Sequence, residues 1–162
     1  IKKVLEDKAR FERELRIKKQ QEALKTKSFK ALKGQLPWPA DGRIIAKFGR
    51  QWNSKLKTTT ENPGIDIKGQ PGSPIRTVLG GVVTTITYIR GYGTTIIVDH
   101  GGGFYTVYSH VTNIQTVVDG QVRNGDIIAY MGDSGSINGS KLHFEIWGKG
   151  QKLDPEKWLI KK

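Results

Sequence analysis

Lys141-Leu142-His143-Phe144-Glu145-Ile146 alternates polar and apolar residues without a break. Successive side chains of a β-strand point to opposite faces of a sheet, so this alternation predicts a strand. Its even-numbered, apolar residues should enter the core. Its odd-numbered, polar residues should share the opposite face, where they are available for chemistry.

Short runs of the same kind, rich in Val, Ile, Thr and Tyr, recur from Trp38 onward between glycine-rich turns. They predict further strands over residues 44–48, 64–67, 74–78, 82–89, 94–99, 104–110, 121–122 and 127–132. No helical periodicity appears between these runs, which argues against a sheet of alternating parallel strands and helices. The pattern predicts a mainly β domain with an antiparallel sheet.

The first 33 residues have a different character. They contain neither Gly nor Pro, and they carry 12 Lys and Arg against 5 Asp and Glu. This composition predicts a basic helix, either the end of a coiled coil or a regulatory helix. Gly34 predicts the end of that helix, because glycine commonly follows a helix C-terminus. We therefore expect a helix over 1–33, a linker over 34–40 and a β domain over 41–162.

Charge and composition restrict the functional classes. The net charge of +12 favours anionic partners, such as acidic cell-wall polymers or lipid headgroups. No nucleic-acid-binding motif accompanies the charge, so no nucleic-acid partner is predicted. The absence of cysteine excludes disulfides and thiolate metal sites.

Three histidines are the candidates for chemistry. His100 precedes three consecutive glycines, which predicts a place in a hairpin turn. Strand alternation places His110 on one face with Tyr108, and His143 on the polar face of its strand.

A series of short motifs follows in order along the chain: Asn62-Pro63-Gly64-Ile65-Asp66-Ile67, Gly72-Ser73-Pro74-Ile75, Gly80-Gly81-Val82-Val83, Gly91-Tyr92-Gly93, Gly132-Asp133-Ser134-Gly135, Leu142-His143-Phe144-Glu145 and Asp154-Pro155. In this order they resemble the LytM-type (lysostaphin-type) peptidase family, over about residues 36 to 160. The resemblance implies an antiparallel β scaffold with a groove for peptidoglycan cross-bridge peptides. It also implies a zinc site built from two histidines and one aspartate.

The chain departs from that family at the zinc site. By the resemblance, Asp66 and His143 match zinc ligands, and His110 matches a further histidine of the site. Asn62 stands where the first ligand histidine is expected, and Lys141 where a catalytic histidine is expected. An amide oxygen is a poor zinc ligand. Two unit charges about 4 Å apart repel by roughly 4 kcal/mol at an effective dielectric constant near 20, so a lysine beside the site opposes a cation.

We therefore expect no catalytic residue, with His110 and Lys141 as vestiges, and no bound metal or other cofactor, with Asp66 and His143 as vestigial ligands. What remains is a groove that could bind a partner, lined by Asn62, Asp66, Tyr108, His110, Lys141 and His143.

Degenerate LytM-type domains that follow a coiled coil resemble activators of murein amidases. The resemblance implies an N-acetylmuramoyl-L-alanine amidase and peptidoglycan as partners, and a periplasmic location or one outside the cell envelope. The upstream coiled coil would connect the domain to a membrane division complex. Three alternatives stay open: an active zinc endopeptidase that cuts cross-bridge peptides, a peptidoglycan-binding scaffold, and a relic whose groove has no function.

Overall fold

The computed structural model describes residues 6–16, 29–132 and 139–162. Residues 6–16 and 29–31 are helical and residues 32–33 form a turn, so the helix predicted over 1–33 ends two residues early, while its residues 1–5 and 17–28 lie outside the described residues. Residues 133–138, which include most of the Gly132-Asp133-Ser134-Gly135 motif, also lie outside the described residues. Within the described ranges, no helix combines the length and apolar composition needed to cross a membrane.

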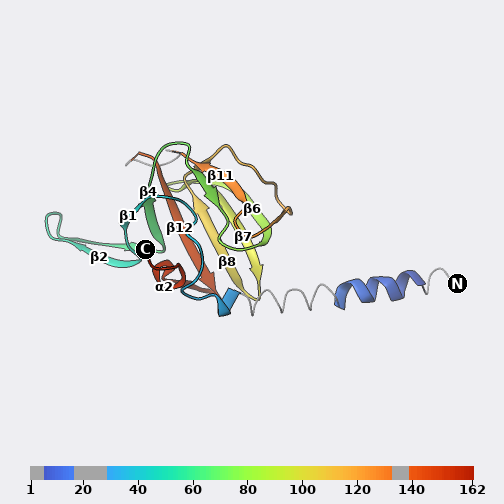
Figure 1. Cartoon of the computed structure of the whole chain (residues 1–162). Coiled ribbons are helices and arrows are strands. Elements are labelled where there is room, and N and C mark those ends of the chain that lie inside the picture. The colour runs from blue at the N-terminus through green and yellow to red at the C-terminus, as the bar shows by residue number, and fades with distance from the viewer. Residues whose placement is uncertain (1–5, 17–28, 133–138) are drawn as a thin grey trace.

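Antiparallel strands build the body of the molecule (Figure 1). The largest sheet has eight strands in the order β1-β4-β12-β8-β7-β6-β10, with β13 paired to β12. Its strands are β1 (Arg43–Ala46), β4 (Ile65–Lys68), β6 (Gly81–Ile89), β7 (Gly93–Gly101), β8 (Phe104–Ser109), β10 (Gln121–Val122), β12 (Lys141–Gly148) and β13 (Gln151–Leu153). A second sheet contains β5 (Pro74–Arg76), β11 (Ile127–Met131) and β9 (Val111–Thr112), and a third contains β2 (Gly49–Asn53) and β3 (Thr58–Asn62).

The predicted mainly β, antiparallel fold is confirmed, and every predicted strand is present with ends within two residues. The sequence patterns missed β2, β3, β9, β13 and the short helix α2 (Pro155–Trp158). β2 and β3 carry almost no apolar residues, and β9 and β13 are only two and three residues long. Such segments give no alternating hydrophobic signal.

A single hydrophobic core joins the large sheet to the three-stranded sheet. Leu142, Phe144 and Ile146 of β12 are fully buried in it, as the alternation predicts. Their partners in this core include Ile75 of β5 and Met131 of β11. The polar residues of β12 therefore lie on the face of the large sheet that points away from this core.

The segment before β1 also contributes to the core. Phe29 is fully buried, and its ring stacks on Phe104 at 4.7 Å between ring centroids and contacts Trp158 at 5.3 Å. Leu36 is fully buried as well and forms a β-bridge with Leu159. Residues 29–36 are thus packed against the C-terminal end of the β domain, while the exact domain boundaries stay a prediction.

His100 does not lie in a hairpin turn, so that prediction is wrong. It belongs to β7 and is fully buried, with Nδ1 2.9 Å from the Gly80 carbonyl oxygen and Nε2 2.7 Å from the Thr106 hydroxyl. The strand continues one residue past His100, to Gly101, and then the glycine turn begins. His100 is therefore a structural histidine inside a satisfied polar network.

Candidate functional site

The register between β4 and β12 builds the centre of the site. Asp66 pairs directly with His143, and Phe144, the next residue of β12, turns to the core. The short separation across paired strands brings the two side chains together. Asp66 Oδ1 lies 2.6 Å from His143 Nδ1.

The second ring nitrogen of His143 is also engaged. Its Nε2 lies 2.8 Å from Oε2 of Glu145, which is two residues further along β12 and on the same face. The other oxygen of Glu145 accepts a hydrogen bond of 2.8 Å from the Trp147 indole N–H. A carboxylate can only accept hydrogen bonds, so this arrangement suits an imidazolium that donates from both nitrogens.

Lys141 completes the charge balance. Its Nζ lies 3.1 Å from Asp66 Oδ2, and both side chains are largely shielded, with relative exposures of 12% and 14%. With His143 protonated, two cations face the two carboxylates of Asp66 and Glu145. The cluster is therefore neutral, and its cations belong to the protein itself.

The pKa values agree with this balance. Burial alone would lower the pKa of His143, but hydrogen bonds and charge interactions with Asp66 and Glu145 outweigh it, and the pKa is raised above 6.5. Burial alone would raise the pKa of Asp66, but the contacts with His143 and Lys141 reverse the direction, and the pKa is lowered below 3.8. Both shifts favour the charged forms of these groups.

The side chain of Asn62 has a local structural role. Its side-chain oxygen accepts a hydrogen bond of 3.2 Å from the Gly64 N–H, which forms a turn between β3 and β4. Among the described residues, no three His, Cys, Asp or Glu side chains are grouped so that they could hold a metal ion. Catalytic zinc needs three protein ligands with free lone pairs and an open fourth position. Both ring nitrogens of His143 face carboxylates, and the Lys141 ammonium lies on the second oxygen of Asp66, so the residues present do not fit a zinc ion.

His110 and Tyr92 form the other wall of the site. His110 follows β8 with a positive φ of 64°, which breaks the strand alternation. Its buried ring lies 6.5 Å from the Tyr92 ring, and the Tyr92 ring lies 4.9 Å from that of His143. Burial and the charges of Glu145 and Asp66 raise the pKa of Tyr92.

Tyr108 does not line the groove, and that prediction is wrong. It is fully buried and pairs across strands with Phe144, a core residue. Its hydroxyl accepts a 3.1 Å hydrogen bond from the Val78 N–H inside the core. Regular alternation would keep Tyr108 on the face of His110, but the positive φ of His110 moves these two neighbours to different sides.

Sequence reasoning missed Tyr92, Glu145 and Trp147 as site residues. The alternation of β12 carried a signal for the last two, because they share the face of His143. Tyr92 lies in the turn between β6 and β7, and no sequence pattern links that turn to β12.

An apolar cavity of about 470 Å³ continues from the charged cluster across the same face of the large sheet. Its lining comes from β6, β7, β8, β12, β13 and the nearby turns, and includes Tyr92, Ile97, Val107, Glu145, Trp147 and Lys152. Register places Glu145 beside Val107 and Val107 beside Ile97, so the cavity follows one row across three strands. The site therefore combines a neutral polar cluster with an apolar groove.

Two curated relatives represent two kinds of protein. The chain is 32% identical over 129 residues to the murein hydrolase activator EnvC of Escherichia coli (strain K12), which covers 80% of this chain and 30% of EnvC. It is 33% identical over 113 residues to the DD-carboxypeptidase/endopeptidase Mpg of Neisseria meningitidis serogroup B (strain MC58), which covers 70% of this chain and 26% of Mpg. The chain thus spans less than a third of either relative.

The fold is shared with a zinc-containing peptidase from Vibrio cholerae, with a TM-score of 0.70 at 22% identity, over 80% of this chain and 41% of that one. The family model of peptidase family M23 matches residues 60–155, which is more than half of the chain. That range holds Asn62, Asp66, Lys141 and His143, and the relatives include a murein hydrolase activator. The chain belongs to peptidase family M23, the LytM-type family.

Proposed function

We propose that this domain regulates peptidoglycan hydrolysis without cutting peptidoglycan, by binding and activating an N-acetylmuramoyl-L-alanine amidase during cell separation. The observation that carries the proposal is the closed charge cluster. Asp66 and Glu145 occupy both nitrogens of His143, and the Lys141 ammonium takes the second oxygen of Asp66. Such a site offers no open position at which a metal could activate water. The similarity to EnvC, a murein hydrolase activator, supports the role of an activator.

The groove is the proposed binding surface for the amidase. It consists of the polar cluster with Asn62, Asp66, His110, Lys141 and His143, together with the adjoining apolar cavity. Because the cluster neutralises its own charges, the cavity supplies the binding energy by burying apolar surface of the partner. The same proposal places the domain in the periplasm or outside the cell envelope, with peptidoglycan nearby and a division complex reached through the upstream coiled coil.

A stimulation assay on dye-labelled sacculi tests the proposal. Amidases from the source organism are incubated with sacculi, with and without the chain, and dye release is measured. We expect stimulation by the wild-type chain and its loss in Val107→Asp, which puts a charge into the cavity. Val117→Asp is the matched control, because Val117 is 67% exposed and is not among the residues that line this cavity.

The second candidate function is a zinc endopeptidase, which the similarity to Mpg favours. Metal analysis and peptide release separate the two candidates. Stoichiometric zinc, together with peptide release from sacculi by the chain alone and its loss with a chelator, would overturn the regulatory proposal. Sedimentation with sacculi without any effect on an amidase would instead support a peptidoglycan-binding scaffold.

A further inference from the structure

The β2–β3 hairpin is the most exposed part of the β domain. It forms a two-stranded sheet of its own and projects from the body (Figure 1). Every residue from 50 to 61 is exposed, and two of them are large and apolar: Trp52 is 65% exposed and Leu56 is 70% exposed. The side chain of Asn53 orders the tip by accepting hydrogen bonds from the backbone N–H groups of Lys55 and Leu56.

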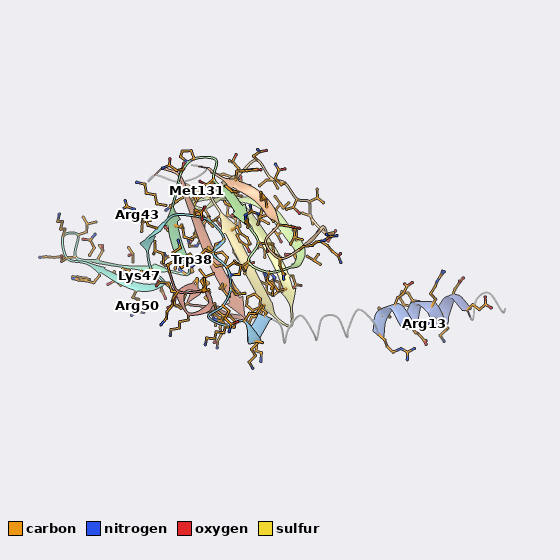
Figure 2. All side chains as sticks on the ribbon, viewed as in Figure 1. Arg13, Trp38, Arg43, Lys47, Arg50 and Met131 are labelled. Carbon is orange, nitrogen blue, oxygen red and sulfur yellow. The ribbon has the colours of Figure 1, made fainter. Side chains whose placement is uncertain are left out.

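Positive charge dominates the hairpin and the strand before it. From residue 42 to residue 60 there are five cations and no acidic residue. The cations are Arg43, Lys47, Arg50, Lys55 and Lys57, and Figure 2 shows the first three at the base of the projection. The next acidic residue, Glu61, stands opposite Arg50 in the strand register and so compensates only the base. The tip therefore combines two apolar side chains with uncompensated positive charge.

We propose that the tip of the β2–β3 hairpin docks on the surface of an anionic lipid bilayer. Trp52 and Leu56 enter the headgroup region, and Lys55, Lys57 and Arg50 contact lipid phosphates. Tryptophan favours this interface because its indole has an apolar body and one polar N–H. Basic residues beside inserted apolar side chains are typical of peripheral membrane binding.

The shape of the hairpin favours a bilayer over a glycan chain or an acidic protein. A glycan site would offer the Trp52 ring as a platform in a groove with polar partners around it, whereas Trp52 lies on a convex projection. Leu56 at the apex has no polar group with which to bind a sugar, but burying its apolar side chain in a lipid layer is favourable. The inward-facing backbone groups of β2 and β3 pair with each other, and the outward-facing groups can be hydrated in the headgroup region, which contains water.

Cosedimentation of the full chain with vesicles tests the proposal. We expect binding to phosphatidylethanolamine vesicles that contain phosphatidylglycerol, weaker binding at high salt, and little binding to vesicles without the anionic lipid. Each cation near such a surface contributes about a fivefold gain in affinity, so Lys55→Gln with Lys57→Gln should weaken binding roughly 25-fold. The control removes the same charge with Arg90→Gln and Arg123→Gln, at the β6–β7 turn and just after β10. The strand order puts β6 and β10 at the opposite edge of the large sheet from β1, so the control should keep nearly full affinity.

Fluorescence locates the contact at the tip. The Trp52 emission should shift to the blue when vesicles are added, and this shift should be absent in Trp52→Phe, which still binds. Trp52→Ala with Leu56→Ala should lose most binding while its urea-unfolding curve stays that of the wild type.

Three outcomes would overturn the proposal. These are equal binding to neutral vesicles, equal losses in the tip and control charge variants, or a dependence on Trp52 that appears with sacculi and not with vesicles. The last outcome would assign the hairpin to the cell-wall polymer. None of these measurements involves an amidase, so they test membrane docking independently of the proposed regulatory role.

Discussion

Replacing Asp66 by Asn tests whether the charge cluster holds the domain together without a metal. The substitution keeps the shape of the side chain and removes its charge. In the wild type, Asp66 accepts contacts from two cationic side chains, at 3.1 Å from Lys141 Nζ and 2.6 Å from His143 Nδ1. In Asp66→Asn, Lys141 and His143 lose their carboxylate partner although both side chains are shielded from solvent.

The structure sets the size of the effect. A pair of unit charges at 3.1 Å gains about 5 kcal/mol at an effective dielectric constant of 20, before desolvation is subtracted, which makes this an upper limit. Hydrogen bonds to charged groups contribute about 1.5–3 kcal/mol each. Loss of one partner from a buried charged network typically costs about 3–5 kcal/mol. We expect Asp66→Asn to lower the free energy of unfolding by that amount.

Urea unfolding at neutral pH with a chelator present measures this loss. The transition midpoint should fall while the slope of the transition stays constant. Asp41→Asn is the control, because Asp41 is exposed, and its effect should stay within about 0.5 kcal/mol. A double-mutant cycle with Lys141→Met should give a coupling energy of about 0.5–3 kcal/mol between Lys141 and Asp66.

One result would refute this reasoning. If Asp66→Asn unfolds like the wild type in chelator, and the two differ only when zinc is added, then a metal ion rather than Lys141 balances Asp66.

Four further predictions use the same unfolding assay. The raised pKa of His143 means that its stabilisation is complete below about pH 6.5 and is lost as pH rises through the folded-state pKa, so wild-type stability should fall over that window while His143→Gln stays flat. The lowered pKa of Asp66 acts in the opposite direction and removes stability only as the pH falls below 3.8. Phe29→Ala should cost about 3–5 kcal/mol, because it empties a fully buried position between aromatic rings. Gly64→Ala should cost about 1–3 kcal/mol or more, because the new methyl group would collide with the carbonyl oxygen of Phe144.

Local sequence patterns were sufficient for nine of the thirteen described strands and for the identity of the family. Alternation in residues 141–146, turn glycines and the order of short motifs depend on neighbours along the chain, and the observed strands agree with them. The same patterns placed His143 and Glu145 on one face of β12. The departures at Asn62 and Lys141 are equally visible in the sequence alone, because they concern only which residue stands at a position.

Contacts between strands required the folded molecule. The register of β4 on β12 decides that Asp66 meets His143, and the fold alone brings Tyr92 from a distant turn to the same ring. A single positive φ at His110 separates it from Tyr108, which no count of alternating residues can foresee. Which side chains meet across a sheet depends on the strand register and on the backbone angles of residues far apart in the chain. The closure of the charge cluster is therefore a property of the tertiary structure.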